Sequence, residues 1–272
     1  MSIRRVGFIS NPKTEPKQLN DMIEYLESNK IKLFFDPHTA KKIKQKPTKP
    51  GDMNVDLGVL VGGDGTFLWG ANKLNPGTLL LPVNAGDLGY LAEISLEQGV
   101  NGLERIFGGD YFVEKRTKII INNKYEVLNE AIICPTIPAT LLELEITLDD
   151  SEKIKMKSDG VLVATPTGST AYSFSLGNPV IHPDTKAYLI APISPMQRDQ
   201  PSIVVPSHMK TRIRLLSKEK EANLILDGRY EAKHLGGDFF ELTESINTAD
   251  FIRFNKDFKH HYVNIAERRR NG

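Results

Sequence analysis

The segment LVGGDGT (60–66) places three glycines and one aspartate directly after an apolar run. The run DLGVLVGG (56–63) predicts a strand buried on both faces, and TFLWGANKL (66–74) predicts the helix that follows it. In open parallel sheets, ligands bind at the carboxyl ends of the strands, where a helix N-terminus and successive backbone N–H groups favour anions. The segment therefore predicts a phosphate-binding turn at the edge of an α/β sheet.

The aspartate in this turn, Asp64, needs an explanation, because phosphate-binding loops usually carry a lysine instead. We expect the turn to bind the phosphates of a donor mainly through its backbone, with Gly62, Gly63, Gly65 and Thr66 as the loop residues. The carboxylate could then hold Mg²⁺ against the phosphates, or accept a proton from a hydroxyl that attacks a phosphoryl group. The alternative is a tight turn in which Asp64 only caps the helix.

Strands and helices alternate through the first part of the chain. Further strands are predicted at RRVGFIS (4–10), IKLFFD (31–36) and GTLLLPVN (77–84), and a helix at EPKQLNDMIEYLESNK (15–30). The basic segment 37–55 contains prolines and a glycine and is predicted to be irregular, with its role left open. Continuous apolar strands that alternate with helices indicate a parallel sheet covered by helices, so residues 1–110 are predicted to form an α/β domain.

After about residue 110 the sequence becomes rich in strand patterns. Segments such as LLELEITLDD (141–150) alternate polar with apolar residues, and long helical patterns are absent. We therefore predict a second, mainly β domain over residues 111–250. The tail, residues 251–272, is assigned to the first domain.

The composition favours a soluble cytoplasmic protein of ordinary globular type. The chain has 272 residues, a formal net charge of +1 and a single cysteine, Cys134. The small net charge predicts neither nucleic-acid nor membrane binding, and one cysteine permits no disulfide within the chain, which suits a reducing compartment. The sequence contains no signal-peptide pattern and no apolar run long enough to span a membrane. No cluster has the spacing of a structural zinc site, so we expect no protein-held metal and only Mg²⁺ brought by a nucleotide.

Two further clusters carry polar groups in unusual places. VLNEAII (127–133) puts Asn129 and Glu130 inside a predicted apolar strand, so at least one of them faces inward unless the strand bends or ends there. A buried amide or carboxylate needs partners. The pair is interpreted either as an edge or bulge position, or as groups that grip ribose hydroxyls or an amide-bearing ring.

The other cluster follows a predicted strand at 160–164 and reads TPTGSTAY (165–172). Ser169 or Thr170 is predicted to be a helix N-cap, and small hydroxylated residues at a helix start would form a polar pocket floor of low bulk. Tyr172 offers an aromatic face on which a base could stack. The alternative is a capped turn rich in hydroxyl groups that binds nothing.

Taken in order, GGDGT (62–66), NAGDLGYLAE (84–93), NE (129–130) and TPTGSTAY (165–172) resemble the NAD kinase family over nearly the whole chain. GGDGT alone has close variants in diacylglycerol kinases and phosphofructokinases, whereas the combination is specific. The resemblance implies a Rossmann-like N-terminal domain and a β-sandwich-like C-terminal domain, with NAD between them and the C-terminal tail crossing back to the first domain.

The resemblance also implies an activity: transfer of a phosphoryl group from ATP or inorganic polyphosphate to the 2′-hydroxyl of NAD's adenosine ribose, which gives NADP. Asp64 would accept the proton of this hydroxyl, with Gly65 beside it. Asn129 and Glu130 would hold the ribose and the nicotinamide side of NAD, and Asp159 would contact its nicotinamide end.

The adenine side would be lined by residues of two segments, namely Tyr90, Thr167, Thr170, Ala171, Tyr172 and Ser175. Lys157 stands where many relatives have an arginine that would contact the diphosphate of NAD. Lysine keeps the positive charge but cannot form the two parallel hydrogen bonds that a guanidinium group offers. Asp227 and Arg229 lie in a turn, LDGRY (226–230), that resembles one reaching NAD. Divalent cations such as Mg²⁺ would accompany the donor, and family members commonly form homodimers or homotetramers.

Two other functions remain open for this sequence. One is a lipid or sugar kinase that uses the same glycine-aspartate loop with a different acceptor pocket, which the NE and TPTGSTAY segments argue against. The other is a non-catalytic NAD(P)-sensing module, which Asp64 argues against.

Overall fold

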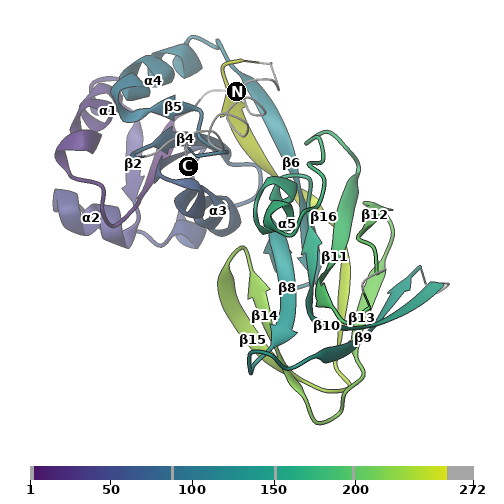
Figure 1. Ribbon diagram of the computed structural model, residues 1–272. Helices are drawn as coiled ribbons and strands as arrows, with labels where there is room; N and C mark the ends of the chain where they lie inside the picture. The colour runs from purple at the N-terminus through teal and green to yellow at the C-terminus, as the bar shows by residue number, and fades with distance from the viewer. Residues whose placement is uncertain (1–2, 87–88, 150–151, 198–199, 256–272) are drawn as a thin grey trace. The chain divides into compact units, whose positions relative to one another are not determined.

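The structure is a computed structural model that describes residues 3–86, 89–149, 152–197 and 200–255 (Figure 1). The chain divides into two compact units: the first comprises Met1–Lys115 and Thr248–Gly272, and the second comprises Arg116–Asn247. The first unit is α/β and the second is mainly β, so the predicted fold class is confirmed.

A parallel sheet with the order β2-β1-β3-β4 forms the centre of the first unit. β5 and the last residues of β16 also pair in parallel with β4. The elements of this unit are β1 (Arg5–Ser10), α1 (Lys17–Ser28), β2 (Lys32–Phe35), α2 (Pro37–Ile43), β3 (Leu57–Gly62), α3 (Asp64–Lys73), β4 (Leu79–Asn84), β5 (Ile94–Ser95), α4 (Gly99–Phe107), the start of β6 (Phe112–Ile121) and the end of β16 (Phe239–Arg253). Of the predicted tail, residues 256–272 lie outside the described residues.

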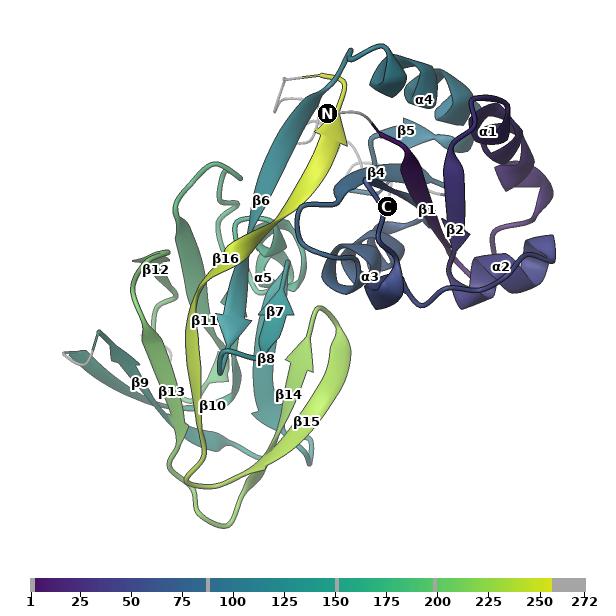
Figure 2. The ribbon, with the colours of Figure 1, turned by 180° about the vertical axis from the view of Figure 1, so that it is seen from behind.

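Helices cover both faces of this sheet, which is why every residue of β3 and β4 is buried (Figures 1 and 2). α1 and α4 lie on one face and share a core with the strands. That core includes Leu19, Met22, Val59, Val61, Leu103 and Ile106. α3 lies on the other face, where a Cβ atom at Gly70 would overlap the side chain of Leu60, so glycine lets the helix approach β3 closely.

The prediction that segment 37–55 is irregular is wrong, because it contains α2 and a short 3₁₀ helix, Pro50–Asp52. The carboxylate of Asp36 caps α2 by accepting the backbone N–H groups of His38 and Thr39, at 3.0 and 3.1 Å. Pro37 lies in the first turn of α2, where its ring fixes φ at a value that suits a helix. An aspartate followed by a proline is a helix-start signal, and the other prolines of the segment, Pro47 and Pro50, lie beyond the end of α2, where they do not interrupt it.

Antiparallel pairs join the strands of the second unit along the path β15-β14-β8-β10-β9-β13-β16, and β11 and β12 continue from β10. The elements are the rest of β6 and β16 with β7 (Tyr125–Val127), β8 (Glu130–Pro135), β9 (Leu142–Leu148), β10 (Glu152–Ala164), α5 (Tyr172–Ser175), β11 (Ala187–Pro195), β12 (Ile203–Pro206), β13 (Thr211–Leu215), β14 (Glu221–Leu226) and β15 (Arg229–Leu235). The side chains of these strands enclose a core of their own.

The long strand β10 changes its partner halfway along. Residues 152–158 pair with β9, whereas residues 161–164 pair with β8. Between them lies Gly160, whose φ of 150° favours glycine and where a Cβ atom would meet the carbonyl oxygen of Ile133. Asp159, one of the predicted site residues, therefore sits at the point where β10 passes from one partner to the other. None of the helices within the described residues is long and apolar enough to cross a membrane.

A buried arginine ends β16 in the first unit. The Arg253 side chain is 1% exposed, and its Nε donates to Glu114 Oε2 at 2.7 Å. Its Nη1 donates to Glu93 Oε2 at 3.1 Å and to the Leu91 carbonyl oxygen at 2.9 Å. The other Glu93 oxygen accepts the backbone N–H of Phe254 at 2.7 Å. One guanidinium thus joins β16 to the segment that follows β4.

We expect Arg253→Met to lower the free energy of unfolding by roughly 3–5 kcal/mol, because removing this buried cation leaves two partly buried carboxylates, Glu93 and Glu114, without it. Urea denaturation followed by circular dichroism measures this change.

The matched control is Lys155→Met, since the Lys155 side chain is 70% exposed and its nitrogen lies 3.9 Å from Glu145. An exposed pair of this kind contributes at most about 1 kcal/mol. Equal losses in the two variants would contradict the role assigned to Arg253.

Candidate functional site

The glycine-aspartate turn leaves β3 at Gly62 and starts α3 at Asp64, two residues before the predicted start of the helix. The backbone N–H of Thr66 donates to the Gly63 carbonyl oxygen at 2.8 Å, which closes the first turn. A Cβ atom at Gly62 would overlap the Thr66 side chain, so the tight turn requires glycine there. Cβ atoms at Gly63 and Gly65 would meet nothing within 4 Å, which leaves room beside the turn for a ligand.

The carboxylate of Asp64 connects this turn to the segment after β4. Its two oxygens accept the backbone N–H groups of Tyr90 and Leu91, at 2.9 and 3.1 Å. A Cβ atom at Gly89 would overlap this carboxylate, so the glycine allows the close approach. The interpretation in which Asp64 only caps α3 is therefore wrong. Each carboxylate oxygen keeps a lone pair with which it can accept a further hydrogen.

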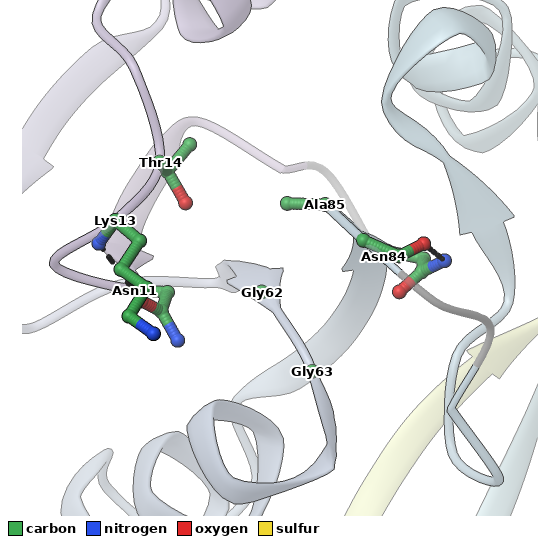
Figure 3. Close-up of a pocket in the computed structure, with 8 residues that line it drawn as sticks. Asn11, Lys13, Thr14, Gly62, Gly63, Asn84 and Ala85 are labelled. Carbon is green, nitrogen blue, oxygen red and sulfur yellow. Dashed lines mark hydrogen bonds between the residues drawn. The ribbon is translucent and has the colours of Figure 1, made fainter.

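A cavity of about 180 Å³ opens beside the turn (Figure 3). It lies at the carboxyl ends of β1, β3 and β4, where ligands bind in parallel sheets. Its lining residues are Asn11, Lys13, Thr14, Gly62, Gly63, Asn84, Ala85 and Gly86. Two members of the predicted phosphate loop line it, whereas Gly65 and Thr66 do not. Sequence reasoning did not single out the residues from the loop after β1, although a polar NPKT segment directly after a buried strand was a usable signal.

In the second unit, the chain bends at residues 128–129, between β7 and β8, so Asn129 lies outside the strand in which it was predicted. The carboxylate of Asp227 accepts the backbone N–H groups of Leu128, Asn129 and Glu130, at 2.9, 2.7 and 3.1 Å. The Asn129 carbonyl oxygen in turn accepts the N–H of Thr165 at 2.9 Å. Three segments far apart in the sequence are thus held together by the backbone of the NE pair.

Glu130 is the buried member of that pair, as one of the two was expected to be. The residue is 5% exposed, and its Oε2 has no hydrogen-bond partner among the described residues. Burial, with a further contribution from the negative charge of Asp227, raises the pKa of the Glu130 carboxyl to about 7. A buried carboxyl oxygen without a partner is unfavourable unless a ligand supplies a hydrogen-bond donor.

The TPTGSTAY segment folds differently from the prediction. Neither Ser169 nor Thr170 is a helix N-cap: a 3₁₀ turn, Gly168–Thr170, precedes α5, and Ala171 lies before that helix. The Ser169 hydroxyl donates to the Pro166 carbonyl oxygen at 2.6 Å and accepts the N–H of Ile181 at 2.9 Å. Hydroxyls that could have capped a helix are thus used to hold the loop itself.

The remaining predicted residues of this segment differ in exposure. Thr167 is buried, and its hydroxyl lies 3.4 Å from Arg116 Nη1. The Thr170 hydroxyl donates to the Thr167 carbonyl oxygen at 3.1 Å. Tyr172 is 40% exposed, and Ser175 is also exposed, so both can be reached from outside the unit.

Three charged residues predicted for the site occupy separate places in the second unit. Lys157 on β10 pairs with Glu143 on β9 at 2.7 Å, so its ammonium group already has a carboxylate beside it. Asp159 is half-buried two residues later, and Arg229 is exposed at the start of β15. Asp227 holds the 128–130 backbone in the way described above, which makes it a positioning residue.

Two family models together match most of the chain. The ATP-NAD kinase N-terminal domain matches residues 6–111, and the ATP-NAD kinase C-terminal domain matches residues 128–254. The chain belongs to the NAD kinase family. A relative from Methanosphaera stadtmanae named NAD kinase is 34% identical over 265 residues, which are 93% of this chain and 96% of that protein. These matches confirm the family predicted from the motifs and give no support to a lipid or sugar kinase or to a sensing module.

Solved structures of the family share the fold. A yeast NADH kinase complexed with NADH has a TM-score of 0.87 at 20% identity and covers 98% of this chain and 87% of that one. An NAD kinase from Archaeoglobus fulgidus in complex with ATP has a TM-score of 0.82 at 23% identity, with 96% and 98% covered. At sequence identities of 20% and 23%, this structural similarity establishes the fold of the chain and nothing further.

The described residues contain no group of three or more His, Cys, Asp or Glu side chains that could hold a metal ion. Two oxygen groups of the kind that suits Mg²⁺ belong to this region: the Asp64 carboxylate at the glycine-aspartate turn, and Asn84 Oδ1 in the cavity lining, which is buried and has no hydrogen-bond partner among the described residues. Either fits an ion that takes most of its ligands from water and from the phosphates of a substrate.

We expect Glu130→Gln to remove a pH dependence of stability. The folded-state pKa, about 7, lies above the usual 4.5, so the folded protein binds this proton more tightly than the unfolded chain does. Wild-type stability should therefore fall as pH rises from about 4.5 to about 7, by about 3 kcal/mol relative to the variant. Urea denaturation at a series of pH values measures the difference.

Glu104→Gln, which changes an exposed carboxylate on α4, is the matched control and should follow the wild type at every pH. If Glu130→Gln also follows the wild type, Glu130 ionises like a surface carboxylate, and the effect assigned to its burial is absent.

Proposed function

We propose that this chain transfers a phosphoryl group from ATP or inorganic polyphosphate to the 2′-hydroxyl of the adenosine ribose of NAD, which gives NADP. The observation that carries the proposal is the Asp64 carboxylate, held at a phosphate-binding turn in a chain of the NAD kinase family. The names of the similar proteins, an ATP-NAD kinase family and an NAD kinase relative, support the same reaction.

In this mechanism Asp64 accepts the proton of the attacking hydroxyl. Two backbone N–H groups hold its carboxylate in one orientation, so the remaining lone pairs need no reorganisation before the reaction. The backbone of Gly63 and Gly65 faces open space in which donor phosphates fit, and Gly62 lines the cavity beside it. The protein's contribution is then mainly positioning, with a moderate contribution from the base.

Residues of the second unit are proposed to bind NAD. Glu130 Oε2 is buried without a partner, and a ribose hydroxyl would supply the missing donor. Asn129 is held next to it by the Asp227 carboxylate, whose own role is to position this backbone. The remaining proposed contacts of NAD are Gly65, Tyr90, Lys157, Asp159, Thr167, Thr170, Ala171, Tyr172, Ser175 and Arg229.

Asn84 Oδ1 or the Asp64 carboxylate would hold, directly or through water, a Mg²⁺ ion that accompanies the donor. Such an ion would supply positive charge beside the transferred phosphoryl group.

Assembly and location complete the proposal. We expect a homodimer or homotetramer, which light scattering coupled to gel filtration measures directly, and a cytoplasmic location. Both rest on the family and on the composition of the chain.

Asp64→Asn should keep the fold and NAD binding while NADP formation falls by about 10²–10⁴-fold, the usual effect of losing a general base. The assay supplies NAD, Mg²⁺ and either ATP or polyphosphate, and the same run identifies the donor. Calorimetric titration with NAD and the melting temperature report binding and folding, since asparagine also places an amide NH₂ near the Tyr90 and Leu91 N–H groups.

Asp110→Asn serves as the matched control, because Asp110 is an exposed carboxylate of the same unit that pairs with Arg105 at 2.6 Å. It should leave NADP formation unchanged. Full activity in a folded, NAD-binding Asp64→Asn variant would contradict the proton-acceptor role, and wild-type protein that makes no NADP with either donor would overturn the proposed function.

A further inference from the structure

We propose that the loop after β1, residues 11–14, is the wall of the donor site that binds the donor's phosphate chain, with Lys13 as its cation, and that this site recognises the phosphates and not the base. The inference rests on the proposed function and specifies how its donor is bound. Figure 3 shows the loop on one side of the cavity, with Asn84 and Ala85 on the other and the two glycines between them.

Hydrogen bonds hold the loop in place and engage the carbonyl oxygens of Asn11 and Thr14. The Asn11 N–H donates to the Val61 carbonyl oxygen at 2.8 Å, which ties the loop to β3 next to the turn. The Lys13 N–H donates to Asn11 Oδ1 at 2.8 Å. Lys42 of α2 donates to the carbonyl oxygens of Asn11 and Thr14, at 2.9 and 2.5 Å. These two carbonyl oxygens, which would repel an anion, are thereby engaged, and Lys42 gives segment 37–55 a structural role.

Two buried polar atoms of the cavity lining lack partners. Thr14 is 5% exposed and Asn84 is 7% exposed, and neither Thr14 Oγ1 nor Asn84 Oδ1 has a hydrogen-bond partner among the described residues. Asn84 Nδ2 donates to the Gly86 carbonyl oxygen at 2.6 Å, which leaves Oδ1 as the free end of the amide. Buried polar groups are almost always paired, so both atoms point to a ligand that supplies an acceptor for the hydroxyl and a donor for the amide oxygen. A phosphate oxygen and a Mg²⁺-bound water meet these two needs.

Lys13 is the one charged residue among the described residues that line the cavity, and it forms no ion pair with any of the residues that the structure describes. Gly63 adds the N-terminal end of α3, a helix of ten residues whose dipole favours anions there. An exposed lysine beside a helix N-terminus is a site for a phosphate group, and it supplies the cation that the glycine-aspartate turn itself lacks.

The described lining of this cavity suits phosphates better than a base. Its volume is about 180 Å³, whereas pockets that enclose drug-sized ligands usually measure about 300–1,000 Å³, so the cavity holds only part of a nucleotide. Among the described residues, the lining contains no aromatic ring on which a base could stack, and Ala85 is its one apolar side chain. The phosphate chain therefore carries the recognition, and donors that differ only in their base, or that have none, should bind alike.

The test compares Lys13→Met with the wild-type full chain, with inorganic tripolyphosphate, ATP and GTP as probes in the presence of Mg²⁺. Loss of a charge-assisted contact should weaken tripolyphosphate binding, measured by calorimetry without NAD, by roughly 10- to 100-fold. The KM for each donor should rise by the same factor, while NAD affinity stays unchanged. Thr14→Val, which keeps the shape of a buried side chain, should weaken the same probes to a smaller extent.

Lys41→Met is the matched control, because Lys41 is an exposed lysine of α2 that does not line the cavity, and it should bind tripolyphosphate as the wild type does. Lys13→Arg should retain binding. Unchanged tripolyphosphate affinity in Lys13→Met would overturn the assignment of the loop. Wild-type binding of ATP more than tenfold tighter than that of GTP and tripolyphosphate would overturn recognition by phosphate alone. Lys13-dependent binding without NADP formation would instead support this site and overturn the proposed function.

Discussion

The hydrogen bonds between the Asp64 carboxylate and the backbone of Tyr90 and Leu91 are the constraint on which the first unit's candidate site depends. Parallel strands end at one edge of the sheet, so their loops meet there, but loops carry unpaired N–H groups that must find acceptors. A carboxylate satisfies two of them at once. The same side chain that is suited to accept a substrate proton therefore also fixes the loop beside it, and glycine at position 89 provides the necessary room.

The second unit solves a similar problem with a different carboxylate. Asp227 accepts three successive N–H groups at the bend that precedes β8, and its negative charge contributes to the raised pKa of Glu130. Asp227, which positions the backbone, is thus coupled electrostatically to Glu130, which is proposed to contact the ligand. Burial without a partner costs stability at neutral pH, which is typical of groups retained for binding and not for packing.

Much of the first unit followed from the sequence, because fully apolar strands that alternate with amphipathic helices leave few other arrangements. The errors came where several residues compete for the same local role. Segment 37–55 was predicted irregular although Asp36 and Pro37 start a helix, and Ser169 and Thr170 were predicted caps although their hydroxyls bond to the loop. Asn129 was placed in a strand because periodicity does not reveal a bend held by a residue almost a hundred positions away.

The sequence by itself determined the family, the fold class, the glycine-aspartate turn and most of the proposed contact residues, since these depend on local pattern and on motif order. Only the tertiary structure decided which side chains are unpaired, because pairing depends on segments that are distant in the chain. It placed residues 11–14 against the turn, braced them with Lys42, and left Thr14, Asn84 and Glu130 each with a buried atom that has no partner among the described residues. Burial and partner geometry are properties of the folded chain, and they separate a polar residue that binds a ligand from one that holds a loop.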